Sequence, residues 1–522
     1  MKVLFILLVL CTGNLMAQNR ADIIIRNGKI IDGTGNPWYY GDVAIRAHTI
    51  VATGNLNTWS ADNIIDATGL IIAPGFIDVH THIEDDEVKN PTANNFIRDG
   101  VTTVITGNCG SSHVNTGAYL AFIDSLRLSV NTATFIGHND VREAVMGKAN
   151  RPPTSQELDK MIALVNKAMQ EGAVGFSTGL IYTPGSYAST DEIIALAKVA
   201  AAYNGVYATH MRNESDSVTY AIHEALRIAK AAGIPLQISH FKIGGQQNWG
   251  RSRQTIEMVK KARTDGLDVT IDQYPYTASS TALNTLLPDW ILAGNDSVVK
   301  QRLRQPAVVK EATGYMLKKL AARKMHHFSY AVVAFYKADT TLNGKSIEAI
   351  NLLWKRKHTA AAEATTIIDM VIGGGASMVF HGMSEDDVKC IMQYPFNMPA
   401  SDASIRVMNE GAPHPRGYGT NARILGRYVR EQKIITLEEA IRRMTSLPAQ
   451  KFHLTDRGLL RPGFAADIVL FDADAVTDLS TFQQPHQYSA GFKYVIVNGK
   501  ITLNNGIHTG VRNGMALYNK PR

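Results

Sequence analysis

The chain has 522 residues, of which 45% are apolar and 19% charged, and its formal net charge is +7. These values exclude an intrinsically disordered chain, and the length exceeds what one hydrophobic core usually organises, so we expect a large domain with a smaller satellite. Lysine and arginine form no basic run or aromatic-interleaved patch. The charge therefore favours solubility or weak attraction of anionic small molecules, and it does not indicate nucleic-acid binding.

The first 17 residues have the pattern of a secretory signal peptide. Lys2 is followed by a short apolar run, and Ala17 is the small residue before the expected cleavage site. The run is too short to span a membrane, and no second segment of spanning length follows. A lipid anchor at Cys11 is disfavoured because Leu10, rather than a small residue, precedes it. We expect an exported, periplasmic protein that leaves the membrane after cleavage.

Both ends of the mature chain have an antiparallel β pattern. Segments 21–32 and 42–46 alternate apolar and polar residues with turn residues between them. The same pattern returns at 466–472 and 493–500. We expect one small β-sandwich assembled from both termini. Its two parts would be residues 18–73 and 455–522.

The centre of the chain alternates short apolar runs with helical segments. A typical helix, predicted at 191–203, begins with acidic residues and ends at Asn204-Gly205. Seven strands are predicted, at 76–82, 101–109, 133–138, 173–177, 206–210, 236–240 and 267–272. An eighth should lie within 390–399. This alternation predicts an α/β fold, a (β/α)8 TIM-like barrel over residues 74–454.

A long connection separates the last two predicted strands. Residues 288–357 within it are basic and have a helical pattern. Connections of this length are normally lids or subdomains rather than bare loops, so we expect an inserted subdomain here.

Potential metal ligands stand where successive strands should end. His80 and His82 are two residues apart, which puts both imidazoles on one side of a strand. Cys109, His210 and His240 follow three later strands in the same way. A barrel builds its active site at the carboxyl ends of its strands, so this series predicts a metal-dependent hydrolase.

Cys109 bears on the identity of the metal. A thiolate together with imidazoles favours zinc over magnesium or calcium. Because a thiolate can also bridge two metals, the centre could hold either one or two zinc ions. Bound zinc lowers the pKa of its water to about 7, and Asp402 could accept that proton and pass it to a leaving amine. Alternatives are an N-cap role for Asp402 and a disulfide between Cys109 and Cys390. Cys390, however, is expected on the buried face of a helix.

Several motifs together resemble a known family. The segments DATGLIIAPGFIDVHTH (66–82) and GFAADIVLF (463–471) resemble the amidohydrolase superfamily. More narrowly, the chain resembles the N-acyl-D-amino-acid deacylases over essentially its whole mature length. The motifs that carry this resemblance are GNCG (107–110), THMRNE (209–214), SHFK (239–242), DQYPY (272–276), SD (401–402) and PHPR (413–416).

The resemblance implies a role for each matching residue. Cys109, His210 and His240 would hold a tight zinc, and His80 and His82, with Cys109 and Asp402, would form a second, weaker site. Asp402 would be the catalytic acid/base. Residues implied to bind the substrate are Lys242, Tyr274, Ser280 and Arg416. Arg416 suits a free carboxylate because its planar guanidinium gives two parallel hydrogen bonds.

The implied reaction is zinc-dependent hydrolysis of N-acyl-D-amino acids, or of dipeptides with a C-terminal D-residue. One departure is Ala403, where the family usually has glycine after the aspartate; it puts substrate preference in doubt. A cyclic amidase of the hydantoinase or dihydroorotase type, which normally has lysine in place of Cys109, and a non-catalytic binding barrel remain alternatives. Of the other histidines, His138 could line the pocket or serve structure, and His326 and His327 are expected to be solvated. His113, His381 and His414 are candidates for supporting positions.

Overall fold

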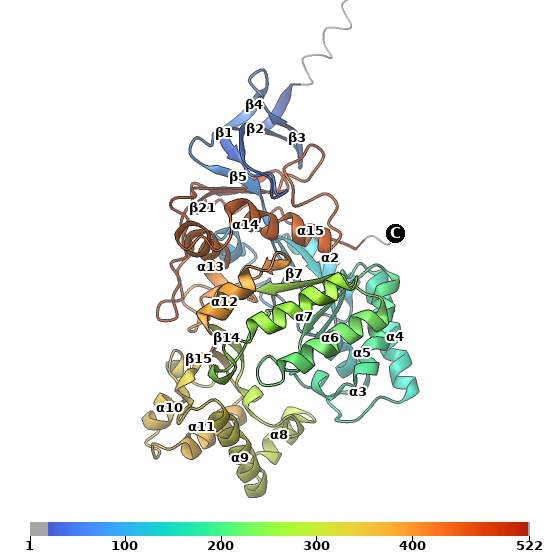
Figure 1. Cartoon of the computed structure of the whole chain (residues 1–522), viewed down its shortest axis with the longest axis vertical. Helices are drawn as coiled ribbons and strands as arrows, with labels where there is room; N and C mark the ends of the chain where they lie inside the picture. Colours follow the sequence, from blue (N-terminus) through green and yellow to red (C-terminus); the bar gives the residue numbers. More distant parts are fainter. Residues whose placement is uncertain (1–18, 520–522) are drawn as a thin grey trace, which may run out of the picture.

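A computed structural model describes residues 19–519 of the chain. The signal peptide predicted at residues 1–17 lies outside the described residues, so cleavage and export stay predictions. The molecule is elongated, with a β-sheet domain at one end, a barrel in the middle and a mostly helical insertion at the other end (Figure 1). Among the described residues, no helix combines the length and apolar character needed to cross a membrane.

The sheet domain takes its strands from both ends of the chain. They are β1 (Arg20–Ile30), β2 (Tyr39–Arg46), β3 (Thr49–Gly54), β4 (Ser60–Asp66), β5 (Ile71–Pro74), β18 (Ile468–Phe471), β19 (Phe492–Val497), β20 (Lys500–Asn504) and β21 (Ile507–His508). Strands β5 and β18 pair antiparallel and join the two halves. The predicted β domain from both termini is confirmed, although its strands form one nine-stranded sheet instead of two separate sheets.

Side-chain alternation along β1 explains how this sheet is stabilised. Ile23 and Ile25 pack into a core that also contains Ile468 of β18, whereas Ile24 points to the opposite face and packs against Ala44. Successive residues of a strand face opposite sides, so one strand contributes to two apolar clusters. The first of these clusters holds the terminal segments together.

The predicted (β/α)8 barrel is confirmed. Its parallel strands are β6 (Phe76–Asp78), β7 (Val101–Thr106), β8 (Asn131–Thr134), β9 (Ile136–Gly137), β10 (Gly175–Gly179), β11 (Val206–His210), β12 (Leu236–Ile238), β13 (Val269–Gln273) and β17 (Asn397–Pro399). Strands β8 and β9 are two parts of one interrupted strand, since β8 pairs with β7 and β9 with β10. A parallel bridge between Thr81 and Ala403 closes the circle.

Helices cover the outside of the barrel and have clear local signals. Helix α4 begins with a capping box between Thr154 and Glu157, and α6 ends at Gly233, whose φ of +65° suits glycine. The barrel helices are α1 (Asn94–Ile97), α2 (Thr116–Leu126), α3 (His138–Met146), α4 (Ser155–Gln170), α5 (Thr190–Ala202), α6 (Val218–Ala232), α7 (Ser252–Thr264), α12 (Glu385–Met392), α13 (Arg416–Arg423), α14 (Leu437–Met444) and α15 (Ser446–Lys451).

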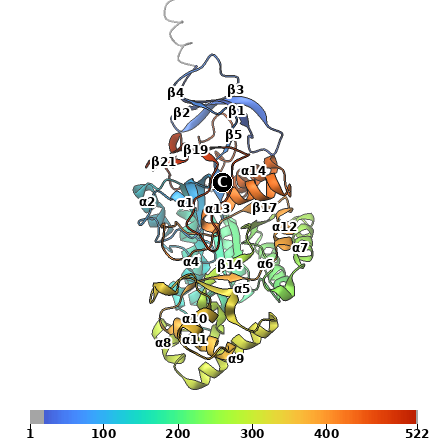
Figure 2. The ribbon, with the colours of Figure 1, turned by 90° about the vertical axis from the view of Figure 1, so that its left-hand side faces the viewer.

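An insertion between β13 and β17 forms the opposite end of the molecule from the sheet domain (Figures 1 and 2). Its elements are β14 (Ala278–Ala282), α8 (Asp296–Arg302), α9 (Pro306–Ala322), β15 (Ala331–Phe335), α10 (Ile347–Leu353), α11 (Ala360–Ile372) and β16 (Ser377–His381). It has a hydrophobic core of its own, which runs from Leu283 to Met378 and so extends beyond the predicted 288–357 on both sides. The chain leaves β13 at its carboxyl end, so the insertion stands over the end of the barrel where the predicted ligands lie.

Candidate metal centre and substrate pocket

The side chains predicted as metal ligands meet at one end of the barrel. His80 and His82 follow β6, Cys109 follows β7, His210 ends β11, His240 follows β12 and Asp402 follows β17. Three of them, Cys109, His240 and Asp402, have positive φ angles of 54°, 35° and 49°. Residues other than glycine adopt this backbone rarely, and they persist there when the surrounding structure holds them in place, as is common at functional sites.

Cys109 lies at the centre of the group. Its Sγ is 3.3 Å from Nε2 of His80, 3.6 Å from Nε2 of His240 and 3.8 Å from Nδ1 of His210. On the other side, Oδ1 of Asp402 is 3.2 Å from Nε2 of His82 and 3.6 Å from Nε2 of His80. The six side chains thus form two overlapping sets that share the neighbourhood of Cys109.

Burial and charge favour anionic donors at this centre. Burial raises the pKa of the Cys109 thiol, but the imidazoles of His80, His210 and His240 outweigh it and hold that pKa well below its usual value. Burial likewise raises the pKa of Asp402, and Arg416 together with the histidines lowers it well below its ordinary range. A thiolate, a carboxylate and four imidazoles suit a zinc-type metal. The donor set therefore fits one or two divalent metal ions.

Two carboxylates that were not assigned a role from the sequence support the histidines. Oε1 of Glu214 lies 2.8 Å from Nδ1 of His240, and its Oε2 lies 3.6 Å from Nε2 of His210. Asp272 accepts a hydrogen bond from the backbone N–H of His240 at 2.6 Å and lies 3.4 Å from Nδ1 of His80. A carboxylate on the outer nitrogen orients a metal-binding imidazole. Glu214 is the last residue of the THMRNE motif, and Asp272 is the first residue of the DQYPY motif. Their positions in these motifs are the signal by which the sequence could have identified them.

The residues predicted to bind substrate lie around the same centre. Nζ of Lys242 is 2.6 Å from Oε1 of Glu214, while Nη1 of Arg416 is 2.7 Å from Oδ2 of Asp402. Arg416 also stacks over the ring of Tyr274, at 4.5 Å from its centroid, and reaches the backbone oxygen of Ser280 at 3.4 Å. The structure therefore brings these four residues together, and their contact with a substrate stays a prediction.

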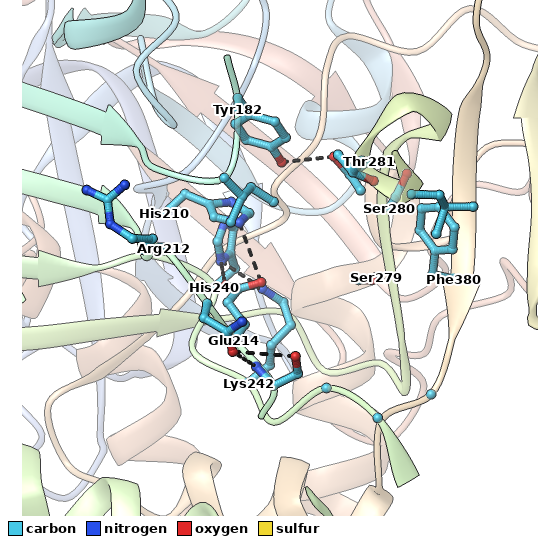
Figure 3. Close-up of a pocket in the computed structure, with 18 of the residues that line it drawn as sticks. Tyr182, His210, Arg212, Glu214, His240, Lys242, Ser279, Ser280, Thr281 and Phe380 are labelled. Carbon is cyan, nitrogen blue, oxygen red and sulfur yellow. Dashed lines mark hydrogen bonds and ion pairs between the residues drawn. The ribbon is translucent and has the colours of Figure 1, made fainter. Parts of the chain in front are cut away.

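A cavity of about 370 Å³ opens beside His210, His240 and Asp402. Figure 3 shows His210, His240, Glu214 and Lys242 on one side of it and residues of β14 on the other. The hydroxyl of Tyr182 contacts that of Thr281 at 2.9 Å and links the two walls. Arg212, which is in the quoted THMRNE motif, is held by an ion pair with Glu224 at 3.0 Å.

The remaining histidines have structural partners. His138 pairs with the buried carboxylate of Glu192 at 2.9 Å, which favours the structural alternative. His414 contacts the backbone oxygen of Ala278 at 2.9 Å, while His113 and His381 pack against aromatic rings. His326 is exposed, as expected. His327 is partly exposed (29%), as a solvated residue would be, but its Nδ1 also lies 2.6 Å from Oε1 of Glu363, a pairing that was not predicted.

Two further predictions concern single residues. Cys109 and Cys390 are both free cysteines, so the disulfide alternative is wrong, and Cys390 is only half-buried on α12. Ala403 is buried and its backbone oxygen accepts a hydrogen bond from the N–H of His82 at 2.9 Å. It is not among the residues of positive φ, so its methyl group requires no backbone strain.

Comparison with known proteins agrees with this geometry. The family model described as "Amidohydrolase family" matches residues 63–503. The chain belongs to the amidohydrolase family. Among curated relatives, it is 36% identical to the N-acyl-D-glutamate deacylase of Alcaligenes xylosoxydans xylosoxydans, over 92% of this chain and 93% of that protein. It is 34% identical to the D-aminoacylase of the same organism, over 95% of this chain and 97% of the relative.

A solved structure leads to the same branch of the amidohydrolases. The N-acyl-D-glutamate deacylase of Bordetella bronchiseptica, complexed with zinc and a phosphonate inhibitor, matches with a TM-score of 0.81 and 34% identity, covering 96% of this chain and all of that one (100%). A D-hydantoinase shares the fold alone, at 16% identity and a TM-score of 0.55. The resemblance to the N-acyl-D-amino-acid deacylases is therefore confirmed, and the chain is an amidohydrolase of that branch.

Proposed function

We propose that this amidohydrolase uses zinc to hydrolyse the amide bond of N-acyl-D-amino acids, releasing a carboxylic acid and a D-amino acid. The observation that carries the proposal is the position of Cys109, whose thiolate contacts imidazoles of both ligand sets. Cyclic amidases normally have lysine at this place, so the cysteine favours linear amides. The names of the relatives at 34–36% identity support the same substrate class.

The family resemblance implies different tasks for the two ligand sets, and the distances among the donors support this division. Cys109, His210 and His240 would hold the tight zinc, with Glu214 fixing the orientation of the two imidazoles. His80, His82 and Asp402 would complete a second, weaker site beside Cys109. Bound zinc supplies Lewis acidity that polarises the amide carbonyl and acidifies water.

Asp402 is suited to move the proton. One of its oxygens faces the histidines and the other faces Arg416, which together keep it ionised and able to accept a proton. Because the carboxylate is buried beside the pocket, the proton it accepts can be passed to the departing amine instead of being lost to solvent.

Unpaired polar atoms indicate where the substrate carboxylate binds. Within the described part of the chain, Nε of Arg416 and the hydroxyl of Tyr274 are buried and form no hydrogen bond, whereas Nη1 of Arg416 is already paired with Asp402 at 2.7 Å. Buried donors without partners are costly, so a ligand that accepts from them binds strongly. The oxygens of a free carboxylate would accept hydrogen bonds from this guanidinium and this hydroxyl.

The outer wall of the pocket bears on which substrate side chain the protein prefers. Lys319 and Arg323, contributed by α9 and the loop after it, line the cavity, and neither forms an ion pair among the residues described. They pack instead near the rings of Tyr315 and Tyr330, at 5.5 and 5.0 Å. We infer that acidic side chains, as in N-acyl-D-glutamate or N-acyl-D-aspartate, are preferred because they would compensate this charge.

A substrate panel tests the proposal. Purified protein loaded with zinc would be assayed on paired N-acetyl-D- and N-acetyl-L-amino acids, dipeptides ending in a D-residue, and a hydantoin. We expect turnover of the D-series with the largest kcat/KM for acidic side chains. Hydrolysis of the hydantoin alone would support the cyclic-amidase alternative, and zinc binding without turnover of any amide would support a binding barrel.

A further inference from the structure

Four side chains in the insertion form a second group of metal-type donors, apart from the catalytic centre. They are His327, in the loop after α9; Glu348, in α10; His358, in the loop after α10; and Glu363, in the first turn of α11. None of the four lines the catalytic cavity. Helices α10 and α11 belong to the insertion, at the end of the molecule opposite the sheet domain (Figure 1).

Contacts within this cluster run alternately between imidazole and carboxylate. Nδ1 of His327 is 2.6 Å from Oε1 of Glu363 and 3.8 Å from Oε1 of Glu348. Nε2 of His358 is 2.7 Å from that same oxygen of Glu348. The two imidazole rings stack, with their centroids 4.2 Å apart. One donor atom from each of the four residues lies within 4.8 Å of every other.

One member of this cluster lies in the protein interior, whereas the side chains of His327, Glu348 and His358 are 29%, 24% and 51% exposed. The side chain of Glu363 is fully buried (0% exposed), and its second oxygen accepts the backbone N–H of Phe328 at 2.7 Å. Its hydrogen bond raises the pKa of His327. A buried carboxylate needs a positive partner, and among the four side chains only His327 contacts Glu363.

We propose that this cluster is a structural zinc site built from His327, Glu348, His358 and Glu363. Two carboxylates and two neutral imidazoles balance the charge of one Zn²⁺, and four protein ligands form a closed site without an open position for substrate. Zinc bonds of about 2.0–2.2 Å separate tetrahedral ligand atoms by about 3.4 Å, so the 2.6 and 2.7 Å pairs would open and the 3.8 Å pair would close. The two stacked imidazoles, now 24° from parallel, would turn apart so that the metal lies in the plane of each ring. Binding replaces the protons between nitrogen and oxygen and releases them to solvent.

The site would connect two loops and two helices of the insertion. His327 and His358 come from two loops that the metal would fasten to α10 and α11. The first loop follows α9, and residues 319 and 323 at this end of α9 line the catalytic cavity. Zinc here would therefore stiffen the outer wall of the pocket without contacting substrate.

Three variants and the wild-type protein test the site. His358 is half exposed, so His358→Ala removes one ligand with little damage to the core, and Glu348→Gln removes another with the same shape. His326→Ala is the matched control, because His326 is the exposed neighbour of His327 and belongs to no donor group. Each protein would be dialysed against buffered free zinc, and zinc per chain, thermal midpoint and amide turnover would be measured.

We expect the wild-type protein and the His326→Ala variant each to bind one additional zinc per chain, compared with His358→Ala and Glu348→Gln. Since even residues behind a ligand contribute about 10–100-fold to metal affinity, loss of a direct ligand should weaken binding by about 100-fold or more. Zinc should raise the thermal midpoint of the wild type more than that of the two ligand variants, while turnover changes by less than about twofold, because no zinc ligand of the barrel is altered.

Equal zinc content in all four proteins would overturn the proposal and leave a hydrogen-bonded cluster only. If His358→Ala does not fold, the isosteric Glu348→Gln decides the question alone. Magnesium and calcium, which prefer oxygen ligands, should neither replace the additional zinc nor raise the midpoint. If the wild-type protein held this additional zinc but hydrolysed no member of the substrate panel, the result would contradict the proposed function and not the zinc site of the insertion.

Discussion

The two donor clusters of this protein, one in the barrel and one in the insertion, differ in how they use similar residues. The barrel cluster is assembled from distant strand ends, between His80 and Asp402, and three of its residues have strained, positive φ angles. The cluster of the insertion comes from neighbouring helices and loops, and its His327 has an ordinary extended backbone with φ of −139°. Strain thus accompanies only the cluster that faces a cavity.

The two clusters also differ in what remains unpaired. Beside the barrel cluster, the Tyr274 hydroxyl and Nε of Arg416 are buried without hydrogen-bond partners among the described residues. In the insertion, each of the four side chains contacts another of the group. Catalytic metal sites keep an open position, whereas structural sites are closed by protein ligands. On this comparison we expect the barrel cluster to serve substrate and the proposed site in the insertion to serve stability.

The largest effect is expected from Cys109→Ala, because its sulfur contacts imidazoles of both ligand sets. The variant should lose the catalytic zinc and its turnover together while keeping the zinc of the insertion. His80→Ala, by contrast, should retain the tight zinc, since Cys109, His210 and His240 stay in place. Metal analysis and amide hydrolysis check both variants; full zinc content with normal turnover in Cys109→Ala would contradict the ligand assignment.

Asp402→Asn should keep the fold and the tight zinc and lose about 10²–10⁴-fold in kcat, since an amide cannot carry the proton. Circular dichroism and zinc content serve as controls for structure. A variant with wild-type kcat would reduce Asp402 to a structural residue of the loop after β17.

Arg416→Ala should raise KM for N-acyl-amino acids, with a loss of about 2–5 kcal/mol in binding, and affect the corresponding carboxamides much less. Because Arg416 helps to hold the pKa of Asp402 low, its removal should raise that pKa. The acid limb of the pH–rate profile would then move to higher pH, since Asp402 must be ionised to accept a proton. Equal effects on acids and carboxamides would mean that Arg416 does not bind the carboxylate.

The smallest effect is expected from Lys319→Ala, because this lysine is exposed and its charge is screened. An exposed ion pair contributes up to about 1 kcal/mol, so kcat/KM for N-acetyl-D-glutamate should fall up to about fivefold. The value for a neutral N-acetyl-D-amino acid should not change. Lys318→Ala, at the exposed neighbouring position that does not line the cavity, is the control. A similar loss on both substrates would contradict a preference for acidic side chains.

Much of the barrel could be predicted because its signals are local. Short apolar runs ended at His80, Cys109, His210 and His240, and parallel strands of a barrel bring such ends together whatever the details of the loops. The eighth strand was harder, since β17 is only Asn397–Pro399 and contains a proline. It is held by its neighbour β13 and by the bridge from Thr81 to Ala403 rather than by its own propensity.

The sequence by itself determined the order of strands and helices, the donors at the strand ends and the family, because periodicity and motifs are properties of neighbouring residues. Only the tertiary structure decided that Glu214 supports His210 and His240, that Arg416 lies against Asp402, and that His327 is paired with Glu363. These contacts join side chains from different loops or strands. Their partners are chosen by packing and charge balance in the folded protein, which no local pattern encodes.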